Sequence, residues 1–317
     1  NPIYSDHGLN LNARLFPDGP IMDAWLNYVR ACVTRYKGKV TMWEVWNEPD
    51  GGKNKDSYEL YANLFVRTAK LIKEIDPDAK VASFGVCSPN KPYIRQSMEF
   101  IAKADGVKYM DYLTYHAYWQ NPETVIPAVK QLRKDIDAYS PSIGLLQGET
   151  GCPSQLEYGH AMSRIEWTEY SQAKWDLRRM LSDKGKAIPT TIFSISDMNY
   201  GVRDNIVKKN VKGLLETDGQ NKVIRPKEAF HAVRNLVSLW NVMGSPVHCT
   251  ATVGGEGDYS LYAFESSEGD RSYALWEDSS VPSNILAMWP VRLEVQDYVF
   301  DKPVCVDIRT GQVYSVR

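Results

Sequence analysis

Apolar runs typical of buried strands alternate with amphipathic helical patterns along the first two thirds of the chain. The strand-like runs lie at 40–46, 81–86, 112–118, 143–149 and 190–196, and the helical patterns lie at 20–36, 57–75, 92–104, 123–139, 167–183 and 227–241. Such alternation indicates parallel strands joined by crossover helices. Near-continuous apolar strands are typical of a parallel sheet covered on both faces. The pattern therefore predicts an α/β fold.

The last quarter of the chain follows a different pattern. The segments 259–265 and 271–277 flank a turn rich in Ser, Gly and Asp, and the segment 304–316 has the pattern of a second hairpin. We therefore predict two domains. A strand–helix domain is expected over 1–241, and a small antiparallel β-sandwich domain over 242–317.

Charge and cysteine content exclude several classes of function. The 317 residues include 37 basic and 39 acidic side chains, which gives a net charge of −2. This balance argues against a polybasic nucleic-acid or membrane-surface binder, and no apolar run reaches the about 18 residues of a membrane span. The five cysteines are scattered without a CxxC pair, so we expect free thiols. We predict no nucleic-acid partner, no membrane and no metal.

Two glutamates lie at the ends of predicted strands. Glu48 ends the string WEVWNE, and Glu149 ends the string LLQGE. The carboxyl ends of parallel strands meet at one end of a barrel, and barrel enzymes assemble their active sites there. The sequence therefore predicts that these two carboxyl groups face one another.

The side chains around Glu48 divide between two faces of the predicted strand. Strand alternation puts Glu44, Trp46 and Glu48 on one face, and Asn47 on the other. Asn47 reaches the same site as Glu48 only if the strand distorts at its end, and we predict that distortion.

A pair of facing carboxyl groups suits glycoside hydrolysis. One group donates a proton to the leaving oxygen, and the other, ionised, attacks the anomeric carbon. Burial and neighbouring charge separate the two pKa values. The competing hypotheses are a Cys152 or Cys87 nucleophile with His116 or His160, and a metal site at Cys152 and His160. Neither has the orienting residue or ligand spacing that such sites use.

Three strings resemble segments of the clan A retaining glycoside hydrolases. WEVWNEP resembles their acid/base segment on barrel strand 4, LLQGETG their nucleophile segment on strand 7, and YHAYW their His-x-Tyr on strand 6. NPIYS, RYKGKV and the stretch from Gln172 to Arg234 resemble most the family of β-xylosidases and α-L-iduronidases, family 39, and its family 5 relatives.

This resemblance implies a (β/α)8-type TIM barrel and a double-displacement reaction. Glu48 would be the general acid/base and Glu149 the nucleophile. Asn47 would contact the sugar 2-hydroxyl, Tyr118 would hydrogen-bond the nucleophile, and His116 would line the site. The carboxyl groups of retaining enzymes lie about 5–5.5 Å apart, and the reaction needs no cofactor.

Further residues are candidates for sugar subsites. The strand at 190–196 lacks the Trp that the clan often has there, and Asp197, Asn199 and Tyr200 are expected to replace it as ligands. The tryptophans that can stack on a sugar face, or pack as ordinary core, are Trp46, Trp119 and Trp167. The long loop at 150–170 is expected to shape the site.

The strand count leaves the barrel incomplete at the N-terminus. With Glu48 on strand 4, only NPIYS remains for strand 3, and strands 1 and 2 are missing. The open flank is costly because it exposes backbone groups and core. Either the sequence is part of a longer chain, or another chain supplies the missing strands, or the incomplete barrel oligomerises. We expect a homo-oligomer or a partner chain to cover the open side.

The leading hypothesis is a retaining β-glycosidase acting on an oligo- or polysaccharide. The alternatives are a non-catalytic carbohydrate-binding or scaffold protein, and a transglycosylase with the same residues. The sugar, the linkage and exo or endo action stay open. The cellular location is unknown, with a secreted or periplasmic one slightly favoured over a cytoplasmic one.

Overall fold

The computed structural model describes residues 15–90, 92–203, 206–286, 290–296 and 298–316. Contacts divide the chain into two compact units. The first contains the residues up to Ala117 and Ile126–Glu149, and the second contains Tyr118–Val125 and the residues from Thr150 onward. The predicted domain boundary after residue 241 stays a prediction.

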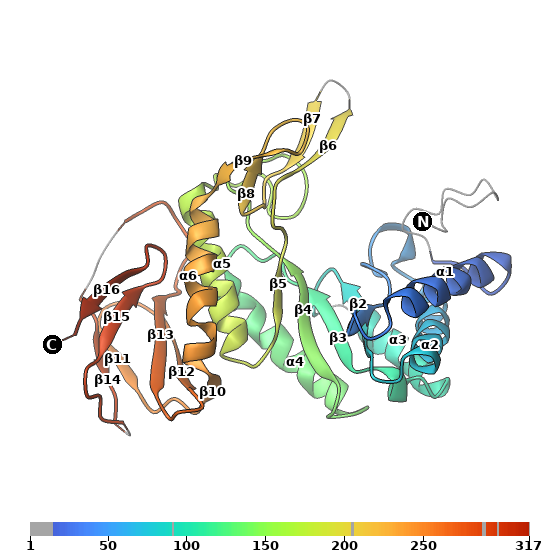
Figure 1. The fold of residues 1–317 in the computed structure, drawn as a ribbon, viewed down its shortest axis with the longest axis horizontal. Coiled ribbons are helices and arrows are strands. Elements are labelled where there is room, and N and C mark those ends of the chain that lie inside the picture. The colour runs from blue at the N-terminus through green and yellow to red at the C-terminus, as the bar shows by residue number, and fades with distance from the viewer. Residues whose placement is uncertain (1–14, 91, 204–205, 287–289, 297, 317) are drawn as a thin grey trace. The chain divides into compact units, whose positions relative to one another are not determined.

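The first unit is built on a parallel sheet (Figure 1). Its strands β1 (Met42–Glu44), β2 (Lys80–Val86), β3 (Tyr112–His116) and β4 (Gly144–Thr150) pair in this order, each parallel to the next. The helices are α1 (Pro20–Tyr36) before β1, then α2 (Tyr58–Ile75), α3 (Pro92–Lys103) and α4 (Ile126–Asp137) between consecutive strands. Two 3-10 turns, η2 (Gly52–Asn54) and η3 (Val107–Tyr109), lie in the connections. The predicted strand–helix succession is confirmed and is consistent with an incomplete barrel.

Helix α2 forms because its charges and its apolar face both suit a helix. Glu59 lies in the first turn and Lys73 in the last, the arrangement that the helix dipole favours. Phe65 and Ile72 lie on the face that is buried in the unit. A fully buried side chain of this size stabilises the fold by about 1.5–3 kcal/mol.

Apolar side chains on both faces of the strands are buried. In β2, every residue after Lys80 is buried, and Leu113 and Tyr115 of β3 are fully buried. This explains why the strands appear in the sequence as continuous apolar runs and not as an alternating pattern.

Two helices form the centre of the second unit. α5 (Glu169–Lys184) begins at Thr168 with a capping box that Ser171 completes, and α6 (Glu228–Met243) packs beside it. One apolar cluster joins these helices to β12 (Tyr259–Glu265) and β13 (Arg271–Glu277), with members Leu181, Leu236, Phe264 and Ala274.

The strands after α6 are antiparallel. β10 (Ser245–Val247), β12 and β13 form one sheet, β11 (Thr252–Gly254) pairs with β14 (Arg292–Glu294), and β15 (Val304–Asp307) pairs with β16 (Gln312–Ser315). Both predicted hairpins are confirmed. The sandwich arrangement of these sheets stays a prediction.

Two hairpins occur where no strand was predicted. β6 (Met198–Arg203) pairs with β7 (Ile206–Asn210), and β8 (Leu215–Thr217) pairs with β9 (Val223–Pro226). All of β9 is exposed, so its sequence lacks the apolar alternation that marks a half-buried strand. The strand expected at 190–196 is likewise shorter: β5 is Thr190–Ile192. A 3-10 turn, η4 (Pro122–Val125), also belongs to this unit.

The segment NPIYS, predicted as strand 3, lies outside the described residues. β2 is the only strand that pairs with β1 within the part of the chain that the structure describes. Among the described residues, no helix is both long and apolar enough to cross a membrane.

Candidate active site

Glu48 lies beyond a strand that ends early. β1 stops at Glu44, and the backbone then turns through positive φ at Trp46 (74°) and at Glu48 (46°). The Glu48 amide donates a hydrogen bond to the carbonyl of Gly85, at 2.9 Å, which anchors this turn to the end of β2. The predicted distortion of the strand end is confirmed. Regular strand alternation does not extend from Glu44 to Glu48, because the strand geometry does not continue past Glu44.

Glu149 and His116 lie opposite one another on neighbouring strands. They are register partners of β4 and β3, and the register shifts by a residue between Tyr115 and His116. The His116 side chain is 2% exposed. The parallel pairing thus brings an imidazole next to the second predicted catalytic carboxyl group.

Glu48 and His116 are in direct contact. His116 Nδ1 and Glu48 Oε1 are 2.9 Å apart, so one proton lies between them. Glu48, His116 and Glu149 each offer one atom to a group in which all atoms lie within 4.8 Å of one another. The structure therefore brings together the two glutamates predicted from the sequence, with His116 beside them and in contact with Glu48.

Such a group of donors is also close enough to hold a metal ion. Two carboxylates and one imidazole suit several divalent cations. The sequence predicts no metal here, and we assign none, because a proton shared by Glu48 and His116 already accounts for their contact.

Glu44 is a third carboxyl group at the same place, and it was not singled out as a site residue. Its Oε1 contacts the Thr114 hydroxyl, and burial among the strands raises the Glu44 pKa above its ordinary value. The charge of Glu149 adds to this rise in pKa, whereas the Thr114 hydrogen bond and the charge of His116 oppose it. The sequence shows that Glu44 lies on the same predicted strand as Glu48, but it does not show that Thr114 and His116 of β3 lie near Glu44.

The tryptophans expected near sugar are packed into apolar surroundings. Trp46 meets Phe16 and Trp25 edge to face, with ring centroids 6.0 and 5.5 Å away. Trp167 is buried, and its indole N–H donates to the Met162 carbonyl. Trp167 therefore packs in the core, whereas Trp46 is only partly buried, and its stacking on sugar stays a prediction.

Tyr118 and Trp119 belong to the second unit. The partly buried Tyr118 packs on a cluster that includes Cys152 and Trp175, and Lys212 Nζ lies 6.0 Å from its ring centroid. The Trp119 carbonyl accepts a hydrogen bond from Trp175 Nε1. Their predicted contacts with the nucleophile and with sugar stay predictions, as does the Asn47 contact with a sugar hydroxyl.

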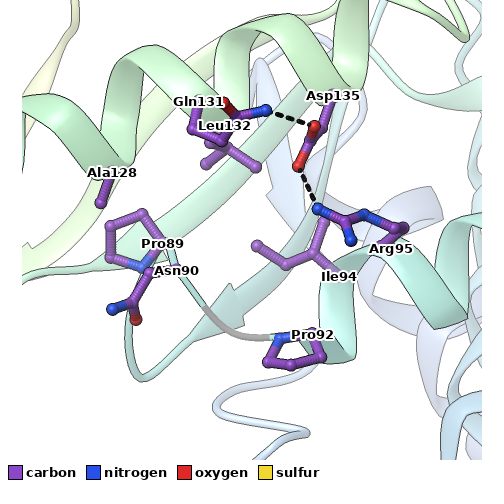
Figure 2. A pocket seen from close by; sticks show the side chains of 9 residues that line it. All are labelled: Pro89, Asn90, Pro92, Ile94, Arg95, Ala128, Gln131, Leu132 and Asp135. Carbon is purple, nitrogen blue, oxygen red and sulfur yellow. Dashed lines mark hydrogen bonds and ion pairs between the residues drawn. The ribbon is translucent and has the colours of Figure 1, made fainter.

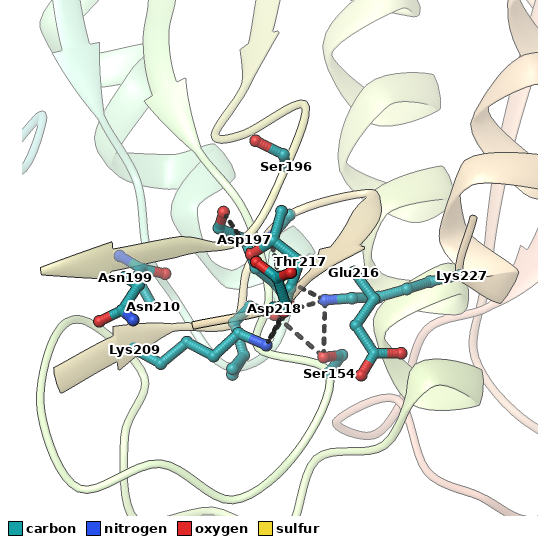
Figure 3. Close-up of polar contacts among 12 residues, drawn as sticks. Ser154, Ser196, Asp197, Asn199, Lys209, Asn210, Glu216, Thr217, Asp218 and Lys227 are labelled. Atoms are coloured by element: carbon teal, nitrogen blue, oxygen red, sulfur yellow. Dashed lines mark hydrogen bonds and ion pairs between the residues drawn. The ribbon is translucent and has the colours of Figure 1, made fainter. Parts of the chain in front are cut away.

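Asp197 is buried in an ionic cluster. Lys227 Nζ lies 2.5 Å from its Oδ1 and also donates to Ser154 Oγ (Figure 3). The Asp197 side chain is 2% exposed, so its carboxylate pairs with Lys227 in the interior of this unit. Its predicted role as a sugar ligand gains no support. Tyr200, in contrast, is 54% exposed and lies against the His160 ring.

The alternative hypothesis of a Cys152 nucleophile also gains no support. Cys152 is fully buried, and burial raises the pKa of its thiol well above the ordinary value, which disfavours the nucleophilic thiolate.

A separate surface hollow of about 270 Å³ lies between α3 and α4 (Figure 2). Its polar residues are already engaged with one another, since Asp135 accepts hydrogen bonds from Arg95 and Gln131. None of the predicted site residues lines it.

Comparisons with known proteins bear on the family resemblance and the fold. Residues 22–135 match the model of the glycosyl hydrolases family 39. A family 39 glycoside hydrolase from the gut symbiont Bacteroides cellulosilyticus WH2 has a TM-score of 0.61 and 18% identity, over 97% of this chain and 64% of that one. A glucosidase from Croceicoccus marinus has a TM-score of 0.57 and 15% identity, over 93% and 59%. A family 39 β-xylosidase from Caulobacter crescentus has a TM-score of 0.52 and 21% identity, over 77% and 53%.

These structural matches establish the fold alone, because their sequence identities are low. The chain spans less than two thirds of the length of each of the three proteins. In sequence over residues 22–135 and in fold over nearly its whole length, the chain resembles the clan A glycoside hydrolases of family 39, and this resemblance supports a glycoside hydrolase.

Proposed function

We propose that the chain is a retaining β-glycosidase with Glu48 as acid/base and Glu149 as nucleophile. The observation that carries the proposal is the meeting of Glu48, His116 and Glu149, with donor atoms within 4.8 Å of one another. Inverting enzymes leave about 6.5–9.5 Å between their carboxyl groups to accommodate a water, whereas retaining enzymes leave about 5–5.5 Å. One oxygen of each carboxylate lies within 4.8 Å of the other, and this closeness favours retention.

The reaction proceeds in two displacements. Glu149 attacks the anomeric carbon while Glu48 gives its proton to the departing glycosidic oxygen, and a glycosyl ester forms on Glu149. Glu48, now ionised, then takes a proton from water, which attacks the same carbon and releases Glu149. His116 orients Glu48 through the 2.9 Å contact at Nδ1.

The finer features of the fold belong to the same proposal. The parallel strands are part of a (β/α)8-type barrel, and the small antiparallel sheets after α6 form a β-sandwich. The substrate is an oligo- or polysaccharide whose degradation the enzyme serves. The solved structures with a similar fold include a glucosidase and a β-xylosidase, so β-glucosides and β-xylosides are the first substrates to test.

The test uses 2-deoxy-2-fluoro-β-glucosides and -xylosides with activated leaving groups. Such compounds form the glycosyl ester quickly and release it slowly. We expect mass spectrometry of the digested protein to find one added sugar on the peptide that contains Glu149, and none in Glu149→Gln. The same variant should lose turnover of aryl β-glycosides.

Other results lead to other functions. Measurable sugar binding without turnover or label would favour a non-catalytic carbohydrate-binding protein. A label on Glu149 with mainly transfer products in the presence of acceptor sugars would favour a transglycosylase. A label on another residue would contradict the assignment of the nucleophile.

A further inference from the structure

The segment Tyr118–Val125 follows β3, the strand that carries His116, after one intervening residue. It contains Trp119, which the sequence predicts as a sugar contact and which is only half-buried. An aromatic ring binds a sugar more tightly when its backbone is already fixed, because ordering a mobile loop costs conformational entropy. The contacts that fix this segment should therefore affect sugar binding.

The first half of the segment is fixed by Trp175 of α5. Its indole N–H donates to the Trp119 carbonyl at 3.0 Å and to the Gln120 carbonyl at 3.2 Å. Trp175 is fully buried, so these hydrogen bonds are formed in surroundings of low dielectric, where they are strong. The backbone at Trp119 is therefore attached to a helix in the interior of its unit.

The second half of the segment is fixed by Arg178, which lies one turn further along α5. Its guanidinium donates to both carboxylate oxygens of Glu123, from Nε at 3.0 Å and from Nη2, and Nη2 also donates to Asn121 Oδ1 at 3.3 Å. The Arg178 and Glu123 side chains are each 9% exposed. Bidentate pairs of arginine and carboxylate are both strong and specific in geometry, so this contact defines the position of the segment.

The same arginine also reaches the antiparallel sheet. Arg178 Nη1 donates to the Ser280 carbonyl at 2.8 Å, and Nη2 lies 3.3 Å from the Asp278 carbonyl. Both carbonyl groups lie just beyond the end of β13. One guanidinium therefore joins the segment to the sheet.

The sheet contacts the segment directly as well. Asn121 Nδ2 donates to the Asp278 carbonyl at 3.0 Å, and Trp276 Nε1 on β13 donates to Glu123 Oε1 at 2.7 Å. Glu123 thus accepts hydrogen bonds from α5 and from β13 at the same time. The position of the segment depends on both elements.

We propose that Arg178 is a positioning residue for sugar binding, which ties the segment Tyr118–Val125 to the end of β13 and so holds Trp119 in a fixed position. This inference rests on the function proposed above. It gives the antiparallel sheet a role in binding that requires no contact between the sheet and the sugar. Lysine cannot take the place of Arg178, because an ammonium group lacks the planar fork that reaches Glu123 and the two carbonyl groups together.

The first test is a double-variant cycle with Arg178→Lys and Trp119→Ala, on the β-glucosides or β-xylosides that the wild type hydrolyses. We expect each single variant to raise KM by about 5–20-fold and to keep kcat within about threefold, because a loss of binding shared by ground state and transition state raises KM alone. The double variant should have about the same KM as Trp119→Ala, because Arg178 acts through Trp119.

Two further variants complete this test. Arg271→Lys is the matched control, because Arg271 pairs with Glu265 at the opposite end of β13, and it should keep the wild-type KM. Trp276→Phe removes a single donor to Glu123 and should raise KM by about 2–5-fold, the scale of one hydrogen bond. This milder change tests the same contact if Arg178→Lys does not fold.

Several kinetic results would overturn the proposal. A KM of the double variant that rises by the product of the two single effects would mean that Arg178 acts independently of Trp119. An unchanged KM in Trp276→Phe, or in a folded Arg178→Lys, would show that these contacts do not affect binding. An equal rise of KM in Arg271→Lys would reduce the effect to a general weakening of the sheet.

The second test requires no turnover. The part of the tryptophan fluorescence that Trp119→Ala removes should be quenched by acrylamide more strongly in Arg178→Lys and Trp276→Phe than in the wild type, because the segment is then less firmly held. Equal quenching overturns the proposal. Failure of the proposed function has a different signature: the wild type would show neither turnover nor label on Glu149, whereas the difference in quenching would remain.

Discussion

At the residue scale, His116 connects the proposed catalytic groups. It contacts Glu48 through Nδ1 and is the register partner of Glu149, so the two carboxyl groups are arranged around a side chain that is nearly inaccessible to solvent. A side chain that is almost fully buried has little freedom to move. His116 therefore keeps Glu48, which lies on an irregular turn, at a constant distance from the strand that carries Glu149.

Removal of the Glu48 carboxyl group should affect substrates unequally. We expect Glu48→Ala to reduce kcat/KM by about 10²–10⁴-fold on glycosides with poor leaving groups and far less on dinitrophenyl glycosides, because only poor leaving groups need a proton. Steady-state kinetics on a series of aryl glycosides checks this. The exposed Glu74 offers a control, and Glu74→Ala should match the wild type throughout. Equal losses on all substrates would remove Glu48 from the acid role.

At the element scale, the irregular ends of β1 and β2 shape the site. β1 ends at Glu44 and β2 shifts its register at Gly85, and these two deviations bring Glu44, Thr114 and Glu48 into one network. Regular strands would have aimed alternate side chains at opposite faces. The site therefore depends on the irregular strand ends, and the irregularity of β2 depends on the positive φ of Gly85.

Gly85 has two roles: it adopts a positive φ, and it leaves space beside Glu44 and His116. Two variants distinguish these roles. Gly85 and Gly38 both have positive φ, of 56° and 70°, but only a methyl group at Gly85 would meet neighbouring atoms. We expect Gly85→Ala and Gly38→Ala each to lose about 1–2 kcal/mol of unfolding free energy for the left-handed backbone. Only Gly85→Ala should also lose more than about tenfold in kcat/KM, since it displaces Glu44 and His116.

Denaturant unfolding and aryl-glycoside kinetics measure the two effects. Normal activity in a folded Gly85→Ala would show that the space beside Glu44 is not needed. A comparable loss of activity in Gly38→Ala would assign the effect to backbone strain alone.

At the scale of the whole molecule, a buried acid makes stability depend on pH. Asp176 on α5 is fully buried, and burial raises its pKa well above the ordinary value, with the Cys152 amide and the charge of Lys227 opposing the rise. A raised pKa means that its contribution to stability is present below the ordinary value and is lost as pH rises through the folded-state pKa.

Asp176→Asn should therefore leave stability nearly unchanged in acid and raise it in alkaline solution, by about 1–3 kcal/mol, the scale of a poorly satisfied buried polar group. Asp183→Asn is the matched control, because Asp183 on the same helix is paired with the buried Arg179. That change should destabilise the protein at every pH, by about 3–5 kcal/mol. Thermal unfolding across pH would contradict the first expectation if Asp176→Asn followed the wild type at every pH.

The exposed edge of β1 leads to an expectation about assembly. Within the described residues, β1 pairs only with β2, and unpaired strand edges favour association with another chain. We expect this chain to self-associate, with a mass above 36.0 kDa in light scattering that rises with concentration. If light scattering shows a monomer at every concentration, the edge of β1 would instead be covered by a longer form of the chain or by a separate partner.

The sequence alone determined the order of strands and helices in the first unit and the positions of the two glutamates at strand ends. Both depend on local patterns: apolar periodicity within an element, and the charged or glycine-rich residues that follow it. Only the tertiary structure decided which side chains meet. Pairing of His116 with Glu149, and of Glu44 with Thr114, depends on the register between strands far apart in the chain and on the shift at Gly85. Likewise, Asp197 had the sequence context of an exposed ligand but lies buried beside Lys227, because the fold of its unit brings a lysine 30 residues away to the same place.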